Sequence, residues 1–269
     1  MSNLLKRVLA GAVGIPLILA VSYYGGILFF VFAAVINAIA LWEFYSMVEK
    51  KDIHPLKYTA IFFSLMVMIG FLELQGSELF LYSFLICSVI IFSVIEIFRG
   101  GKRNPVNVMI VLFGYLYITL PMIFLVALSE LSKNSGLNIL ILIFVLIWTC
   151  DTAAYFGGRA FGKHQLSGIS PKKTWEGAVA GFVFTVIVSL LVHFIFPEKL
   201  ILKDAVIIGF IVGIFSQIGD LFESLIKRHC DVKDSSDIIP GHGGVLDRFD
   251  SLIFVAPVIF LYELLRQHL

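Results

Sequence analysis

Residues 204–265 read DAVIIGFIVGIFSQIGDLFESLIKRHCDVKDSSDIIPGHGGVLDRFDSLIFVAPVIFLYELL. Apolar runs form both ends of this segment, and a dense polar stretch from Asp220 to Ser251 lies between them. The chain has 20 Lys and Arg and 19 Asp and Glu, and 11 of these charged residues fall in that stretch. Ionisable groups at the edge of a bilayer cost free energy, so their concentration indicates a working site. The segment predicts a membrane protein that acts on a charged ligand.

The composition of the whole chain agrees with a membrane setting. Hydrophobic residues make up 59% of the 269 residues, and the mean hydropathy is +0.97, whereas a soluble domain is roughly half apolar. The formal net charge of +1 provides no basic field, so no nucleic-acid partner is expected. Cys87, Cys150 and Cys230 are scattered and lack the pair spacing of zinc sites, so neither zinc nor a disulfide framework is expected.

The fold predicted from hydropathy is all-α: a single polytopic integral membrane helix bundle over residues 1–269. A spanning helix needs about 20 mostly apolar residues. We expect about nine transmembrane helices, with approximate limits 8–24, 27–47, 57–72, 79–98, 106–128, 137–156, 175–196, 204–224 and 251–265. The early spans carry little charge, so we interpret residues 1–135 as mainly scaffold spans and residues 136–269 as the catalytic half.

Positive residues predict the orientation of this bundle. With the N-terminus inside, most of the 20 Lys and Arg lie in cytoplasmic segments, and the external side keeps only Lys133, Lys199, Lys203 and Arg266. This asymmetry favours a cytoplasmic N-terminus and a C-terminus outside. The polar stretch from Asp220 to Ser251 then lies at the cytoplasmic face.

The first polar constellation surrounds the loop between the last two predicted spans. Gln217, Asp220, Glu223, Ser224 and Lys227 share one helical face at i, i+3, i+4 spacing, and Asp247, Asp250 and Ser251 repeat the pattern. Two facing helices that each present an aspartate can hold a hard divalent cation such as Mg2+. The alternative is a salt bridge from Asp220 or Glu223 to Lys227.

The loop between these helices contains Pro240-Gly-His-Gly-Gly244. Glycines allow positive φ and close backbone approach, so this loop can offer amide groups to phosphate oxygens. An ordinary turn is the alternative, but four flanking cations favour phosphate: Lys227, Arg228, Lys233 and Arg248. His242 is a candidate phosphate ligand or proton donor, and a merely exposed histidine is an equal alternative.

The second constellation is Ser170-Pro-Lys-Lys-Thr-Trp-Glu-Gly177. Ser170 suits an N-cap and Pro171 the first helical position, so the helix N-terminus beside Lys172 and Lys173 forms an anion site. The alternative, topological lysines with an anchoring Trp175, leaves Glu176 unexplained.

The third constellation is Asp151, Thr152, Tyr155 and Arg159 on one helical face. Asp151 and Arg159 are too far apart to pair, so Asp151 needs a metal, a lysine or a nucleotide hydroxyl. Outside these clusters, we expect Glu43 and Glu96 to be isolated, solvated acids near helix ends.

These motifs resemble the phosphatidate cytidylyltransferase (CDP-diacylglycerol synthase) family. The match runs through Asp151-Thr-Ala-Ala-Tyr155, Gly158-Arg-Ala-Phe-Gly162, Ser170–Gly177, Gly219-Asp-Leu-Phe-Glu-Ser224 and the segment from Lys227 to Ser251. It covers roughly the C-terminal 120 residues, and the first half agrees mainly in hydropathy. Asp231 and Ser236 depart from it, since the family commonly has glycine at both positions.

The resemblance implies that phosphatidate and CTP give CDP-diacylglycerol and pyrophosphate, by in-line attack on the α-phosphorus of CTP. It implies one or two Mg2+ ions, with a monovalent cation as a further candidate, and a homodimer in the bacterial inner (plasma) membrane. The expected catalytic residues are Asp220, Lys227, Arg228, Asp247, Arg248 and Asp250. The expected metal ligands are Asp220, Asp247, Glu223 and Asp250. The expected substrate-binding residues are Asp151, Arg159, Ser170, Lys172, Lys173, Thr174, Glu176, Ser224, His242, Gly243 and Gly244.

Two other functions remain open at this point. A CTP-dependent lipid or polyprenol kinase would transfer the γ-phosphoryl group instead, and its products would differ. A transporter would place polar groups at the middle of the bilayer and show inverted repeats, whereas these charges cluster at the cytoplasmic edge.

Overall fold

Helices form the whole regular framework of the described chain. The computed structural model describes residues 3–74, 77–132 and 137–268, and Lys133, used above for orientation, lies outside them. The helices are α1 (Asn3–Tyr24), α2 (Gly26–Val48), α3 (Lys57–Glu73), α4 (Glu78–Phe98), α5 (Pro105–Gly114), α6 (Leu120–Ser132), α7 (Ile139–Phe161), α8 (Trp175–Ile195), α9 (Leu202–His229) and α10 (Leu246–His268). A 3-10 turn (Glu49–Lys51) follows α2, and a π-helical turn (Tyr115–Thr119) joins α5 to α6. The all-α prediction is confirmed.

Each predicted span falls on helical chain, but the predicted number of spans is not confirmed. Within the described residues, six helical segments are long and apolar enough to cross a membrane: Gly26–Lys51, Leu79–Phe98, Pro105–Leu131, Ile139–Phe161, Trp175–Ile195 and Leu202–His229. The apolar part of α1, Gly11–Tyr24, is shorter. These segments identify an integral membrane protein.

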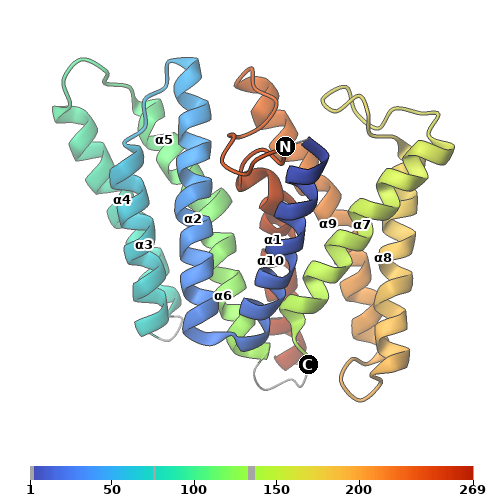
Figure 1. Ribbon diagram of the computed structural model, residues 1–269. Helices are drawn as coiled ribbons and strands as arrows, with labels where there is room; N and C mark the ends of the chain where they lie inside the picture. Colours follow the sequence, from blue (N-terminus) through green and yellow to red (C-terminus); the bar gives the residue numbers. More distant parts are fainter. Residues whose placement is uncertain (1–2, 75–76, 133–136, 269) are drawn as a thin grey trace.

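Successive helices alternate in direction, except that α6 continues α5 through the π-helical turn, so the connecting loops gather at the two ends of the bundle (Figure 1). The N-terminus lies at the same end as the α7–α8 loop and the α9–α10 loop, and the C-terminus lies at the opposite end. The polar motifs therefore share one end of the molecule, as the sequence predicts.

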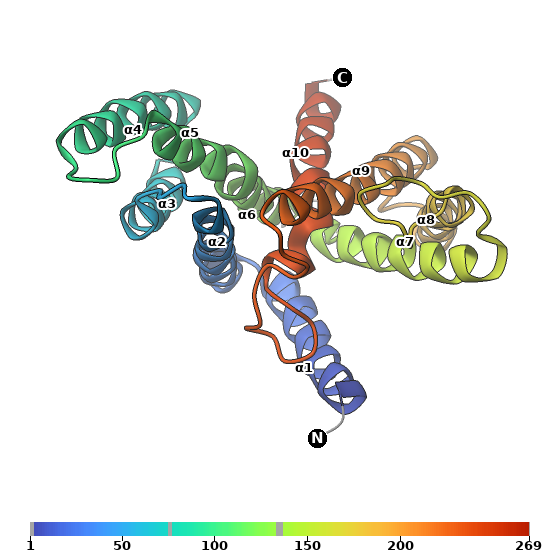
Figure 2. The same cartoon turned by 90° about the horizontal axis from the view of Figure 1, so that it is seen from above.

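Helix α10 lies where the two sides of the bundle meet (Figure 2). It packs on α9 and also contacts α6 and α2, and its residues Val255, Ala256 and Ile259 are fully buried. On one side α7, α8 and α9 pack against one another, and on the other side lie α2 to α6. The first turn of α10 is thus held between the N-terminal and C-terminal halves of the chain.

Candidate active site

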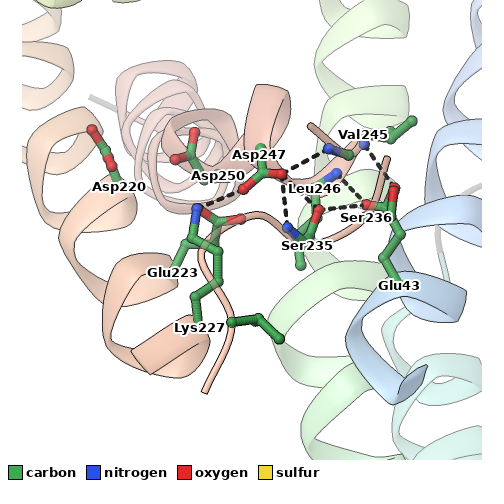
Figure 3. A network of polar contacts seen from close by, with 12 residues as sticks. Glu43, Asp220, Glu223, Lys227, Ser235, Ser236, Val245, Leu246, Asp247 and Asp250 are labelled. Carbon is green, nitrogen blue, oxygen red and sulfur yellow. Dashed lines mark hydrogen bonds and ion pairs between the residues drawn. The ribbon is translucent and has the colours of Figure 1, made fainter. Parts of the chain in front are cut away.

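A glycine brings the acidic residues of α9 and α10 together. A Cβ atom on Gly219 would lie 2.6 Å from the carbonyl oxygen of Asp250 and 3.1 Å from the Cα of Ser251. Only a residue without a side chain therefore allows α9 to cross α10 at this point. The crossing places Asp220 and Glu223 of α9 beside Asp247 and Asp250 of α10 (Figure 3).

Lys227 is the cation of this crossing. Its Nζ lies 2.5 Å from Glu223 Oε2 within α9 and 2.5 Å from Asp247 Oδ1 on α10. Glu223 is fully buried, and Lys227, Asp247 and Asp250 are each 9% exposed. Three buried carboxyl groups therefore share one buried ammonium group, and Glu223 Oε1 has no hydrogen-bond partner among the described residues. Burying uncompensated charge is costly, so this cluster favours a further cation.

Asp247 organises the loop that precedes its own helix. Its Oδ2 accepts hydrogen bonds from the backbone N–H of Ser235 (2.9 Å), the Ser235 hydroxyl (2.9 Å) and the N–H of Gly244 (2.7 Å). Gly243 adopts φ 80°, a left-handed conformation that favours glycine. The Gly244 amide, which the sequence assigns to a phosphate, therefore donates to Asp247 in this structure.

Glu43 of α2 completes this network, and the expectation of a solvated side chain is wrong for it. Glu43 is fully buried, and each of its oxygens lies within hydrogen-bond distance of two donors. The donors are the Ser236 hydroxyl (2.5 Å) and Val245 N–H (2.9 Å) at Oε1, and the Ser235 hydroxyl (3.0 Å) and Leu246 N–H (2.7 Å) at Oε2. The Ser235 hydroxyl has a single proton, which Glu43 and Asp247 share. Figure 3 shows Glu43 reaching the loop from α2.

The sequence contained a signal for Glu43. It lies within the apolar run 27–47, where a charged side chain is expensive unless it is paired. Glu96 is also buried, at 6% exposure, and not solvated as expected. Its Oε1 accepts hydrogen bonds from the Asn104 N–H (2.8 Å) and the Asn107 amide (2.6 Å) at the α4–α5 corner, so its role is local.

A cavity of about 590 Å³ lies beside this crossing, between α7, the α7–α8 loop and α9. Seven predicted site residues from three separate segments line it: Asp151, Arg159, Ser170, Lys172, Lys173, Thr174 and Asp220. Lys173 Nζ lies 2.5 Å from Asp220 Oδ2, so the α7–α8 loop is tied to α9. Arg159 lies 3.5 Å from the Tyr155 hydroxyl. We call this space the lysine cavity.

The start of α8 differs from the prediction. The helix begins at Trp175, and Thr174 is its N-cap, accepting a hydrogen bond from the Gly177 N–H at 3.2 Å. Ser170, predicted as the cap, lies in the loop, where its carbonyl oxygen accepts from the Lys173 N–H. Thr174 offers the same capping oxygen, and the loop folds back so that the Trp175 N–H donates to the His164 carbonyl oxygen at 3.0 Å.

Glu176 braces this loop and does not line the lysine cavity. Its Oε2 accepts hydrogen bonds from the backbone N–H groups of Lys163 (3.1 Å) and His164 (3.3 Å). Its Oε1 lies 2.6 Å from His164 Nδ1. The contacts hold the loop that carries Lys172 and Lys173 in place.

A second polar cavity of about 510 Å³ lies between the α9–α10 loop and Arg248 in the first turn of α10. Its lining residues are Lys233, Asp234, Asp237, Gly241, His242, Gly243 and Arg248. We call it the loop cavity. Of the remaining predicted residues, Arg228 is exposed at the end of α9 and donates to the Val232 carbonyl oxygen at 3.2 Å. Ser224 is half-buried and lines neither cavity.

The two departures from the family pattern both contact the N-terminal half. Asp231 adopts φ 55° in the left-handed region, which explains glycine as the common residue there. Its carboxylate lies 2.5 Å from Lys51 Nζ, and this contact lowers the pKa of Asp231. Ser236 donates to Glu43, as described above.

Carboxylates of the lysine cavity and of the α9–α10 crossing lie within electrostatic range of one another. Asp151 and Asp250 are each repelled by Asp220, while Lys173 and Arg248 attract Asp151. Within the described part of the chain, no three His, Cys, Asp or Glu side chains are close enough to form a complete metal site. The atoms that come closest to forming a metal site are carboxylate oxygens, the ligand type that Mg2+ prefers. Asp247 is the least available of them, since both of its oxygens already accept hydrogen bonds.

Comparison with known proteins gives a consistent result. The model of the cytidylyltransferase family matches residues 5–265. A phosphatidate cytidylyltransferase of Staphylococcus saprophyticus is 35% identical over 263 residues, covering 94% of this chain and 96% of that protein. Proteins of the same name from Synechocystis (32% identical; 97% and 96% covered) and Staphylococcus aureus (30%; 94% and 96%) are also similar. The similarity therefore extends well beyond the C-terminal 120 residues.

Proposed function

The chain belongs to the cytidylyltransferase family, and we propose that it transfers the cytidylyl group of CTP to phosphatidate, giving CDP-diacylglycerol and pyrophosphate. It is an enzyme of the nucleotidyltransferase class. The observation that carries this proposal is a pair of polar cavities, one lined by Arg159, Lys172 and Lys173 and the other by Lys233 and Arg248. A reaction between two phosphate-bearing substrates needs two anion sites that meet at one point.

In the proposed reaction, a phosphate oxygen of phosphatidate forms a bond to the α-phosphorus of CTP. The bond from that phosphorus to the bridging oxygen of the β-phosphate breaks, and pyrophosphate leaves with the electron pair. No covalent enzyme intermediate is needed. Such transfers depend on positioning and on neutralisation of charge rather than on a nucleophilic side chain.

The side chains of the lysine cavity are suited to hold phosphates. Lys172, Lys173 and Arg159 supply three cations around one space of about 590 Å³, which is within the size range of ligand pockets. Asp151 lies in the same wall and is available to a nucleotide hydroxyl. Arg248 and Lys233 supply positive charge to the loop cavity. Arg248 also attracts Asp151, so its charge acts on both cavities.

The acids at the α9–α10 crossing fit a divalent cation. Asp220 has the most exposed side chain of the candidate ligands, and Asp250, Glu223 and Asp247 are additional candidates. When bound, Mg2+ would neutralise the phosphate charge that develops during transfer. Buried carboxylates outnumber Lys227 at the crossing, and Glu223 Oε1 has no hydrogen-bond partner among the described residues. Both observations support a bound Mg2+, and a monovalent cation is a further candidate.

The remaining parts of the proposal concern the membrane. We propose that the helical segments form about nine spans, with the N-terminus and both cavities cytoplasmic and the C-terminus outside. The shared end of the N-terminus and the polar loops supports this arrangement. A homodimer in the bacterial inner membrane, and the division into a scaffold over 1–135 and a catalytic half over 136–269, belong to the same proposal.

Analysis of the soluble product tests the function. Purified protein is incubated with CTP, Mg2+ and phosphatidate in detergent micelles, and the soluble products are separated by ion-exchange chromatography. Pyrophosphate that forms only when both substrates are present supports the proposal. Release of CDP in its place would identify a lipid kinase.

A further inference from the structure

Glu43 brings a side chain of the N-terminal spans into the network at the start of α10. It is fully buried, and it reaches across 192 to 203 positions of sequence to its four donors. Two donors are the backbone N–H groups of Val245 and Leu246, at the start of α10. Such groups have no partner within their own helix. Glu43 therefore caps α10 from another helix, where the helix dipole also favours its negative charge.

The same carboxylate is linked to the acids of the site. The Ser235 hydroxyl lies 3.0 Å from Glu43 Oε2 and 2.9 Å from Asp247 Oδ2. Asp247 in turn contacts Lys227, and Lys227 contacts Glu223. A continuous chain of polar contacts thus runs from α2 to α9 through the loop and the first turn of α10 (Figure 3).

Gly244 leaves space for the Glu43 carboxylate to reach the start of α10. A Cβ on Gly244 would overlap the Ser235 hydroxyl oxygen and lie 2.7 Å from Glu43 Cδ. The absence of a side chain at position 244 is therefore required by the Ser235 hydroxyl and the Glu43 carboxylate.

We propose that Glu43 is a positioning residue for the transfer reaction. It fixes the first turn of α10, so that Asp247 and Asp250 stay at the α9–α10 crossing and Arg248 stays in the wall of the loop cavity. Glu43 lines neither cavity, so it acts through these residues and not on the substrates. The catalytic part of this inference rests on the proposed function. The structural part, that Glu43 holds the loop, stands on the contacts alone.

Replacing Glu43 with glutamine is the most informative substitution. Each oxygen of Glu43 accepts one backbone N–H, so in Glu43→Gln either orientation of the new amide would turn its NH2 group towards a backbone donor. The matched control is Glu96→Gln, which changes another buried and multiply hydrogen-bonded glutamate of the N-terminal half, far from α10 in sequence.

The experiment combines hydrogen exchange with initial-rate kinetics on the full-length purified protein. In Glu43→Gln, peptides covering residues 235–246 should exchange at least about tenfold faster, because hydrogen bonds to a charged group are lost. The kcat should fall about 10–10²-fold, as expected for reacting groups displaced by about 1 Å. The KM values for CTP and phosphatidate should change less than about threefold, since the cavity cations are untouched. Glu43→Asp, which keeps the charge, should recover part of the kcat.

The control separates positioning from general destabilisation. Glu96→Gln should lower thermal stability while leaving kcat and exchange at 235–246 near those of the unsubstituted protein. Unchanged exchange and kcat in Glu43→Gln would overturn the inference, as would an equal kcat loss in Glu96→Gln. If the unsubstituted protein makes no CDP-diacylglycerol, the proposed function fails, and the exchange comparison still decides whether Glu43 holds the loop.

Discussion

Gly244→Ala places one methyl group at the centre of the network between α2 and α10. The backbone φ at Gly244 is not in the left-handed region, so the consequence is one of space alone. The new Cβ would lie 2.5 Å from Glu43 Oε1 and 2.7 Å from Glu43 Cδ, and closer still to the Ser235 hydroxyl oxygen. These atoms belong to buried side chains, so they cannot move into solvent.

The structure sets the size of this effect. Overfilling a packed interior costs about 1–3 kcal/mol, and displacing the Ser235 hydroxyl from a carboxylate costs about 1.5–3 kcal/mol more. We therefore expect Gly244→Ala to lose about 2.5–6 kcal/mol of stability. The catalytic rate should fall about 10²-fold, because Asp247 and Arg248 follow Gly244 closely in the chain and would be displaced with it.

Thermal denaturation and initial rates of CDP-diacylglycerol formation measure the two effects. Gly168→Ala is the control, because a Cβ on Gly168 meets nothing within 4 Å, and it should match the unsubstituted protein. Ser235→Ala removes the nearest obstacle, so the double variant should lose less than the sum of the two single variants. Normal rate and stability in Gly244→Ala would refute the reasoning, as would strictly additive losses.

The remaining predictions concern the acids, the metal and the membrane. Asp220→Asn and Asp247→Asn should each reduce the rate about 10²–10³-fold. Only Asp247→Asn should also lower the melting temperature clearly, since the Asp247 oxygens lie within hydrogen-bond distance of four donor groups. Recovery of activity on neutralising Lys227 as well would remove the metal assignment of Asp247. Chelation of divalent cations should abolish turnover, and added Mg2+ should restore it; full activity in excess chelator would contradict a metal site. A cysteine introduced beside Lys172 should react with a membrane-impermeant reagent only from the cytoplasmic side, and a cysteine beside Lys133 should react only from outside. External labelling of the cysteine beside Lys172 would contradict the proposed orientation of the protein in the membrane.

The sequence predicted the parts of the fold that depend on local pattern. Long apolar runs identified the helices, and the i, i+3 spacing of Asp220, Glu223 and Lys227 placed them on one face that the structure turns towards α10. The helix limits were less certain, because Ser170 and Thr174 are both good N-caps. In the structure Thr174 is the cap, and α8 packs closely on α7 just after it, since a Cβ on Gly177 would lie 3.0 Å from the Cα of Gly158.

The contacts between distant segments could not be predicted in this way. The pairing of Lys173 with Asp220, and of Glu43 with Ser235 and Ser236, joins residues whose separation in sequence gives no periodic signal. For Glu43, the cost of placing a charge inside an apolar run indicates that its carboxylate must be paired. Its partners required the three-dimensional packing of α2 against the start of α10.

Transfer of label from CTP to lipid tests the central claim most directly. Purified protein is given phosphatidate, Mg2+ and CTP labelled at either the α-phosphate or the γ-phosphate, and the lipid is extracted and counted. The account predicts that α-label enters the lipid and that γ-label is recovered in pyrophosphate. Transfer of γ-label to the lipid, with α-label left in soluble CDP, would contradict it.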